Sequence, residues 1–275
     1  MAYGTNAPFG LRPLQSITGG SWTEKTNVYS IYSNPTTGAS LAGSIFTGDP
    51  VIFDPAWADY QNPIPAGGGL IAPYAPTYTA GSPATYSSVP LLGVFMGCEY
   101  FDSQNRLNKS PYWPGGTLVS PGSLIKAWVI DDPNVVYDVQ VSTNSPLSAS
   151  ACLPTVNQQT TQKLAGFFGA NFALDITGQK FTDVTTYPQN PGKGNTLTGQ
   201  SGFYLCASTV QVATTLDADY DHTLATLPLK AIGYTPNPQN QPALKATWAT
   251  TPFLNVRVII NNHVYGHSTP GTTVA

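Results

Sequence analysis

Charged side chains are scarce in this sequence. Asp, Glu, Lys and Arg make up 9% of the 275 residues, against about 25% in typical globular domains. Only 2 of the 14 acidic residues are Glu, and the 11 basic residues stand singly along the chain. The long charged side chains that usually cover exposed helix faces are therefore rare, and amphipathic surface helices are not expected. The lack of a basic cluster also argues against a nucleic-acid partner and against a polybasic membrane anchor.

Long apolar runs are also missing. No segment approaches the roughly 18 consecutive apolar residues of a membrane-spanning helix. The first ten residues, MAYGTNAPFG, contain neither the basic nor the apolar region of a secretion signal. We expect neither a membrane as partner nor a cleaved leader.

Cysteine is rare too. Cys98, Cys152 and Cys206 lie far apart and form no CxxC pair, so the sequence supports neither a zinc site nor a disulfide framework. We expect buried free thiols, as in a protein assembled in a reducing cytoplasm. No group of residues indicates a cofactor.

Glycine, proline and tyrosine are abundant instead. The chain has 26 Gly, 25 Pro and 15 Tyr, a composition that suits short strands joined by turns. The predicted fold is all-β, with a β-barrel or β-sandwich core, long loops, an extended N-terminal arm and little helix. The arm and the first connection take up residues 1–45, and a β-rich domain covers 46–275. That domain is either one unit or two sub-barrels, at about 46–145 and 146–275.

The clearest strands lie between Val89 and Val141. An apolar run, VPLLGVFMGCEYFD, precedes the aromatic segment SPYWPGGT, and AWVIDDPNVVYDVQV has the pattern of a hairpin. Asp132-Pro133-Asn134 fits the tight turn of that hairpin. After the turn, apolar residues alternate with mostly polar ones, as in a strand that has one buried and one exposed face. The expected apolar face holds Val135, Tyr137, Val139 and Val141, and the mostly polar face holds Val136, Asp138 and Gln140.

Four further strands are predicted, at 48–54, 169–176, 203–212 and 253–265. In the last of them, alternation predicts which side chains point inward and which outward. The inward set is Leu254, Val256, Val258 and Ile260, and the outward set is Asn255, Arg257 and Asn261. Residues 157–166 fit one short helix. Long loops are expected at 55–88 and 183–201, and loops of that length are usually functional or mobile.

Three segments come close to a functional motif and fail at a required position. GQSG at 199–202 resembles a nucleophile elbow, but Phe203 stands where the motif needs a second Gly. PGKGNT has Gly194 where the Walker pattern needs Ser or Thr after its Lys. DADYDH at 217–222 resembles a calcium loop, but His222 replaces the Gly at position six and Pro228 the Glu at position twelve.

A pair of histidines and a set of carboxylates are two further candidates for a metal or catalytic site, and neither fits its requirements. His263 and His267 have the spacing that joins two metal ligands on a helix, but Gly266 and the preceding strand favour a turn. A glycosidase needs two facing carboxylates. The candidates here are Glu99, Asp102, Asp131 and Asp132. They lie at strand ends, where Asp commonly caps turns, so we expect neither an enzyme nor a metal site.

Motifs spread along most of the chain carry a resemblance to a known family. They are the opening NAPFGLRP, the segments GVFMGCEYFD and SPYWPGGT, the pair AWVIDDP and VYDVQVST, and the closing VRVIINNHVYG. Together they resemble a family of tailed-bacteriophage virion proteins encoded among head genes, the capsid decoration or cement proteins. The loops at 55–88 and 183–201 carry none of this resemblance.

The resemblance implies a non-enzymatic protein that binds the outside of the phage head and stabilises contacts between capsomers. Its partners would be the major capsid protein and further copies of itself, as a dimer or a trimer. Its location would be the virion, on the capsid surface, after synthesis in the host bacterial cytoplasm. The residues expected at a capsid or partner contact are Pro8, Phe9, Leu11, Arg12, Tyr74, Tyr78, Tyr112 and Trp113.

Two other functions remain open from the sequence. A virion-associated protein that binds or degrades glycans would use the tyrosine-rich loop, through Tyr74, Tyr78 and Tyr86. The second alternative is the major capsid subunit, but that lineage relies on a long spine helix, and no segment here predicts one.

Overall fold

All regular structure that is described in this protein consists of β-strands. The computed structural model describes residues 9–23, 25–54, 68–74, 89–140, 169, 171–175, 194–206, 227–235 and 255–266. None of these residues is helical, so the predicted all-β class is confirmed, and the short helix predicted at 157–166 lies outside the described residues. The strands are β1 (Arg12–Ser16), β2 (Asn27–Ile31), β3 (Ile45–Phe46), β4 (Pro50–Phe53), β5 (Leu70–Pro73), β6 (Gly93–Phe101), β7 (Leu107–Ser110), β8 (Tyr112–Trp113), β9 (Ile125–Ile130), β10 (Val135–Gln140), β11 (Asn171–Asp175), β12 (Gly194–Asn195), β13 (Gln200–Ser201), β14 (Tyr204–Cys206), β15 (Leu229–Tyr234) and β16 (Asn255–Ile260).

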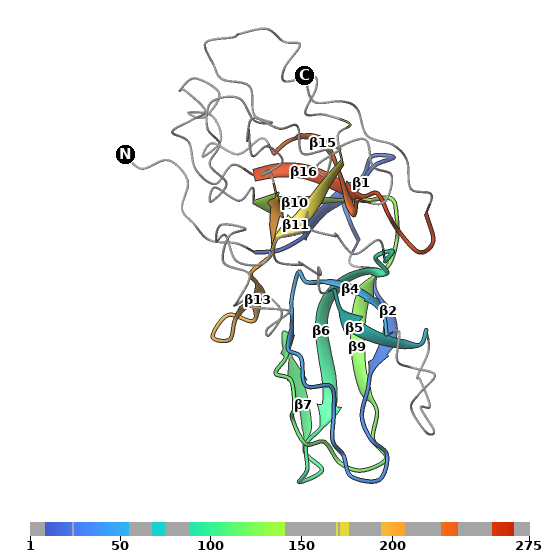
Figure 1. Cartoon of the computed structure of the whole chain (residues 1–275), viewed down its shortest axis with the longest axis vertical. Coiled ribbons are helices and arrows are strands. Elements are labelled where there is room, and N and C mark those ends of the chain that lie inside the picture. Colours follow the sequence, from blue (N-terminus) through green and yellow to red (C-terminus); the bar gives the residue numbers. More distant parts are fainter. Residues whose placement is uncertain are drawn as a thin grey trace, which may run out of the picture.

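The strands form two main bodies, which lie one above the other in Figure 1. The upper body, here called the open sheet, has six antiparallel strands in the order β1-β10-β16-β15-β11-β14. The lower body is a closed barrel of five strands in the order β4-β5-β2-β9-β6, because β6 also pairs with β4. Strand β7 extends the barrel wall from the outer edge of β6.

Two short ribbons complete the barrel side of the molecule. Strand β3 pairs with β8, which places Ile45 opposite Trp113. Strands β12 and β13 form a hairpin, here called the 194–201 hairpin. Thr47 holds this hairpin, because its N–H donates to the Gly199 carbonyl at 2.9 Å and its carbonyl accepts from the Ser201 N–H at 2.9 Å.

The predicted hairpin around Asp132-Pro133-Asn134 is wrong, although the tight turn exists. The Asp132 carboxylate accepts the Asn134 N–H at 2.8 Å, as expected for an Asx turn. The strands on either side nevertheless belong to different bodies, since β9 pairs with β2 and β6 while β10 pairs with β1 and β16. The turn therefore carries the chain from the barrel into the open sheet.

Strand β10 lies between β1 and β16 in the open sheet. All six of its residues are buried, including those on the face predicted to be mostly polar. The Asp138 side chain is buried and needs compensation, because a lone buried carboxylate is costly. The half-exposed guanidinium of Arg12 and the Thr235 hydroxyl both donate to it. Arg12 lies opposite Asp138 in the β1–β10 register, and Arg257 lies opposite it on the other side.

The last strand is confirmed, but its outward set is not outward. Val256, Val258 and Ile260 are buried as predicted, and Leu254 lies outside the described residues. Asn255 and Asn261 are also buried, and Arg257 is partly buried. These polar residues face the interior because β16 is a central strand. The Asn261 amide, for example, donates to the Leu227 carbonyl at 3.1 Å.

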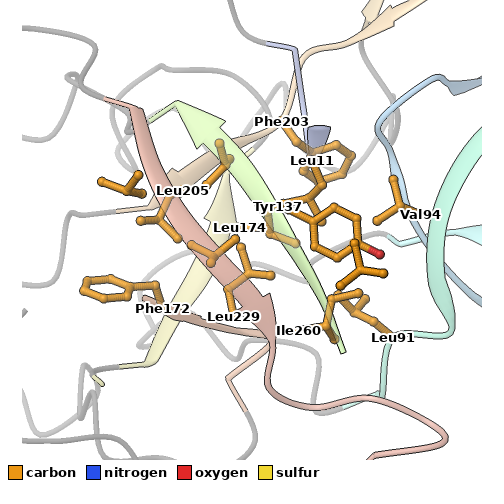
Figure 2. Close-up of a cluster of buried hydrophobic side chains, with 14 of the residues drawn as sticks. Leu11, Leu91, Val94, Tyr137, Phe172, Leu174, Phe203, Leu205, Leu229 and Ile260 are labelled. Atoms are coloured by element: carbon orange, nitrogen blue, oxygen red, sulfur yellow. The ribbon is translucent and has the colours of Figure 1, made fainter. Parts of the chain in front are cut away.

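One hydrophobic core joins the two bodies. Tyr137 of β10 and Leu11, just before β1, belong to the same buried cluster as Leu91 and Val94 near the start of β6. Figure 2 shows Leu91 and Val94 beside the Tyr137 ring. A second buried cluster fills the barrel. Its members include Tyr29, Ile31, Val51, Ile71, Phe95, Trp113 and Val129.

The two bodies draw on strands from several parts of the chain. Within residues 1–45, β1 belongs to the open sheet and β2 to the barrel. The 131–134 turn leads from the barrel strand β9 to β10 of the open sheet. The open sheet therefore combines segments from both ends of the chain.

Substitution of Leu11 tests whether the N-terminal segment belongs to the core. Leu11→Ala removes a fully buried side chain, and we expect a loss of about 2–5 kcal/mol in the free energy of unfolding. Ile17→Ala, at an exposed position just after β1, serves as the control and should change stability by less than about 0.5 kcal/mol. Urea denaturation measures both. Equal midpoints for the two variants would contradict the placement of Leu11.

Candidate functional site

The predicted N-terminal contact residues are mostly tied to the protein itself. Leu11 is fully buried, and its N–H donates to the Gly48 carbonyl at 2.9 Å. Arg12 pairs with Asp138, and its guanidinium lies over the Phe9 ring at 4.6 Å from the ring centroid. Phe9 remains partly exposed, and Pro8 lies outside the described residues. Among the described residues of this group, a partner can reach Phe9 and Arg12 but not Leu11.

The predicted aromatic pair Tyr112 and Trp113 has two different surroundings. Trp113 is fully buried in the barrel, where its indole N–H donates to the Leu41 carbonyl at 3.2 Å. Tyr112 is partly buried and stacks on Phe46, with ring centroids 5.3 Å apart. Trp113 is therefore part of the barrel core, and Tyr112 covers the β3–β8 ribbon.

Of the tyrosine-rich loop predicted at 55–88, only residues 68–74 are described, and Leu70–Pro73 among them form the barrel strand β5 instead of a loop. Tyr74 is fully buried in the shared core, and burial raises the pKa of its phenol. Tyr78 and Tyr86 lie outside the described residues. As placed here, the Tyr74 ring is not available to stack on a glycan.

The described residues near the failed motifs have structural roles. Ser201 of GQSG is buried, and its hydroxyl accepts the Phe203 N–H at 3.1 Å and bonds to the Asp49 carboxyl. His263 is buried, and its Nδ1 accepts the Tyr265 N–H at 3.0 Å. His267 and the DADYDH segment lie outside the described residues. In the described part of the chain, no group of three His, Cys, Asp or Glu residues is arranged to hold a metal ion.

The carboxylates that a glycosidase would need are engaged in pairs or turns. Glu99 lies between Lys109 and Lys126, at 3.2 Å and 3.4 Å, and its bond to Lys109 lowers its pKa. Asp102 accepts the Arg106 backbone N–H and its guanidinium, both at 2.9 Å, which also lowers the pKa of this carboxyl. A general acid needs a raised pKa, so these two carboxyls are unsuited to that role.

Asp49 is a buried carboxyl at a junction of three segments. It follows β3, and its carboxylate accepts the Phe46 N–H at 2.8 Å. Ser201 of the 194–201 hairpin also bonds to it, while its Oδ1 is buried with no hydrogen-bond partner among the described residues. Burial raises the pKa of Asp49 to about 7. This carboxyl therefore takes up a proton close to neutral pH.

Exposed apolar side chains gather at the barrel end that lies farthest from the open sheet. Phe101 and Leu107 lie directly opposite each other on β6 and β7, with exposed fractions of 39% and 51%. Leu118 is 58% exposed and is joined to the same strand end, because the Ser120 N–H donates to the Phe101 carbonyl at 2.9 Å. We call Phe101, Leu107 and Leu118 the distal patch.

The backbone register places all three distal-patch side chains on one outer face. Asp102 bridges to Val119, and Val119 is buried. Because side chains alternate along a strand, Leu118 points to the opposite side from Val119 and shares the outer face with Phe101. Isolated surface leucines are ordinary, whereas three large apolar side chains close together form a candidate contact surface.

Leu197, at the tip of the 194–201 hairpin, is a further exposed apolar residue. Its exposed fraction is 95%, the highest among the large apolar side chains that are described. Two glycines fix the hairpin closely against the barrel. A Cβ atom on Gly194 would lie 2.3 Å from the Phe46 ring, and one on Gly199 would lie 2.7 Å from Pro111. The hairpin is thus a rigid support for Leu197.

These surfaces were not identified from the sequence. Five of the eight expected contact residues are aromatic, and the largest of these, Trp113, is buried. The distal patch depends on the β6–β7 register and on the bridge to Val119, which join residues 101, 107 and 118. Only the alternation at the end of β6 was visible as a signal. No helix in the described part of the chain has the length and apolarity needed to cross a membrane.

The raised pKa of Asp49 predicts a stability that decreases as the pH rises. The folded state binds the proton more tightly than the unfolded chain, so this carboxyl's contribution is complete below about pH 4 and is lost as the pH rises through about 7. This corresponds to a loss on the order of 4 kcal/mol between pH 4 and 8, and Asp49→Asn should flatten the dependence because its amide does not ionise. Thermal unfolding from pH 4 to 9 measures it. Asp132→Asn, on an exposed turn, should keep the wild-type slope; an unchanged slope in Asp49→Asn would contradict the assignment.

Comparisons with known proteins give no relative for this chain. It matches no family model, no curated protein and no solved structure.

Proposed function

We propose that this chain is a non-enzymatic decoration protein of a bacteriophage head, which binds the outside of the capsid and stabilises contacts between capsomers. The proposal starts from the motifs that resemble such proteins. The distal patch is the observation that carries it further, because it offers apolar area for a protein contact at one end of the molecule. The ion pairs of Glu99, Asp102 and Asp138 give additional support, because these carboxylates are already engaged.

The energetics of the distal patch suit a repeated, modest contact. Burying one large apolar side chain yields about 1.5–3 kcal/mol, and three such side chains at the patch are only partly covered. A standard protein interface buries about 800 Å² per partner. On a symmetric shell, the same contact recurs many times, and an oligomer engages several sites at once. The partners proposed are therefore the major capsid protein and further copies of this chain, as a dimer or a trimer on the virion surface.

The N-terminal arm has a smaller part in this proposal than the sequence suggested. Removal of residues 1–20 would delete β1, the buried Leu11 and the Arg12 partner of Asp138. Such a truncation would disturb folding and docking together. A docking contribution is now assigned to residues 1–8 and to the partly exposed Phe9, and a truncation that removes residues 1–8 alone is the appropriate variant.

The distal patch can be tested by removing two of its leucines. The double substitution Leu107→Ser and Leu118→Ser should leave the fold intact, because both side chains are more than half exposed. It should weaken binding to expanded phage heads by about 10- to 100-fold, from a loss of about 1.4–2.8 kcal/mol. Cosedimentation with heads that lack the protein measures the affinity.

A matched control removes apolar area elsewhere. Ile17 and Val89 are exposed to a similar degree, with fractions of 49% and 44%, and neither belongs to the distal patch. The double variant Ile17→Ser and Val89→Ser should therefore bind like the wild type. The distal patch is excluded as the capsid contact if both double variants are folded and bind heads equally well.

An apolar contact also predicts a weak dependence on salt. The distal patch contains no charged side chain, and the nearby Lys109 and Lys126 already pair with Glu99. Screening at ~1 M NaCl reduces the range of charge interactions to about 3 Å, which leaves apolar contacts in place. We expect head binding to be similar at low and high salt. Release from heads at ~1 M NaCl would mean that charge pairs hold the complex.

A further inference from the structure

An open groove lies where the barrel meets the open sheet. It has a volume of about 560 Å³, which falls in the range of small-molecule sites. Its walls come from four parts of the chain that are distant in sequence: strand β2, Gly68, the 131–134 turn and the residues after β16. The lining residues are Asn27, Val28, Tyr29, Gly68, Asp131, Pro133 and Tyr265.

A hydrogen-bonded row of polar groups crosses this groove. The Asn27 amide donates to both carboxylate oxygens of Asp131 at 2.9 Å. The Tyr29 hydroxyl donates to Asp131 Oδ2 at 2.6 Å and lies 3.4 Å from the Tyr265 hydroxyl. Burial and the bond to Asp131 raise the pKa of Tyr29, so its phenol keeps its proton. The Asp131 carboxylate is therefore held in one orientation by two donors.

Tyr265 supplies an aromatic surface beside this row. Its side chain is 55% exposed, so a large part of the ring is open to a ligand. The backbone beneath it is fixed, because the Tyr265 N–H donates to His263 Nδ1 at 3.0 Å and the two rings lie 5.9 Å apart. The next residue, Gly266, is wedged against His263 and Pro133, where an added Cβ would lie 3.2 Å and 3.3 Å from their side chains. The ring is thus exposed on a well-supported turn.

A second, smaller hollow lies next to the groove, on the other side of Gly68. It has a volume of about 220 Å³ and is lined by Phe53, Asp54, Gly68, Gly69 and Leu70. Gly68 separates the two hollows at a point where no side chain fits, since a Cβ there would lie 2.4 Å from the Tyr29 ring. Phe53 packs edge-on against Tyr29, with ring centroids 6.2 Å apart. The two hollows together are large enough for a ligand of more than one ring.

We propose that this groove binds a neutral carbohydrate, with one pyranose ring on Tyr265 and a second unit in the hollow beside Phe53. An aromatic ring presents a flat apolar face to the C–H face of a sugar. The Asp131 carboxylate and the Asn27 amide oxygen can accept from sugar hydroxyl groups, and the Tyr265 hydroxyl can donate to them or accept from them. This site is independent of the capsid contact proposed above.

The charges around the groove decide between ligand classes. Asp131 and the neighbouring Asp132 repel anionic sugars such as uronic acids, and no lysine or arginine lines the groove among the described residues. A cationic ligand would need only the Asp131 carboxylate. A neutral sugar would also use the Asn27 amide oxygen as an acceptor and the Tyr265 hydroxyl as a donor or acceptor. The site would thus differ from the loop of Tyr74, Tyr78 and Tyr86 that the sequence suggested for glycans.

The proposal can be tested by NMR titration of the full chain labelled with ¹⁵N. The probes are methyl α-D-glucopyranoside, methyl α-D-mannopyranoside and methyl β-D-galactopyranoside, together with maltotriose and cellotriose. Methyl β-D-glucuronide and choline represent the anionic and cationic classes. We expect at least one neutral probe to bind with a Kd of about 1 mM or tighter and to shift the amides of Asn27, Gly68 and Tyr265. A trisaccharide of the preferred sugar should bind more tightly than the monosaccharide. The charged probes should not shift these amides.

Single substitutions test which groove residues contribute to sugar binding. Tyr265→Ala should weaken binding of the preferred neutral probe by about tenfold or more, and Asp131→Asn should also weaken it. Phe101→Ala is the matched control, because this aromatic residue is exposed at the far end of the barrel. Binding to phage heads should be unchanged in Tyr265→Ala, which separates this site from the capsid contact.

Three results would overturn the carbohydrate site. The first is that no neutral probe shifts the groove amides of the wild type, a result that does not depend on any variant. The second is that the folded Tyr265→Ala protein binds the preferred probe as tightly as the wild type. The third is that choline or the glucuronide binds in the groove while the neutral probes do not.

Discussion

The ion pair between Arg12 and Asp138 links the first strand, β1, to β10 in the middle of the chain. Asp138 lies in the middle of β10, a strand whose six residues are all buried. A buried carboxylate without a partner is strongly destabilising, and the partner here comes from β1, more than a hundred residues earlier in the chain. Once β1 pairs with β10, Leu11 enters the shared core and its backbone bonds to Gly48 of the barrel side. The open sheet, the core and the barrel are thereby linked near one point.

The sequence predicted the kind of fold because its signals for strands are local. The apolar alternation of β6, β9, β10 and β16 and the abundance of turn residues were enough for the all-β class. Partner choice is not local, and the 131–134 segment illustrates the limit. Its Asp, Pro and Asn encode a tight turn, but nothing in that turn says that β9 pairs with β2 while β10 pairs with β1. Val136, Asp138 and Gln140 likewise gave a polar alternation whose burial depends on Arg12 and Thr235.

The candidate surfaces could be predicted only in part, for the same reason. Tyrosines and tryptophans stand out in the sequence, yet a central position buries Trp113 and Tyr74, and a turn exposes Tyr265. The groove brings together residues 27–29, 68, 131, 133 and 265, and this juxtaposition requires the complete path of the chain between the two bodies. The distal patch requires the β6–β7 register. Because charged side chains are few in the chain, the distal patch contains none, and Asp131 is the one charged residue among the described residues that line the groove.

The direction of the barrel strands has a mechanical consequence. Strands β6 and β9 run between the open sheet and the distal patch, along the long axis of the molecule (Figure 1). A pull between the two ends would therefore act parallel to these strands and load their ladder of hydrogen bonds in shear, so that many bonds must break at once. A pull across the strands would instead break the same bonds one after another. The barrel should therefore withstand a larger force along its long axis than across its strands.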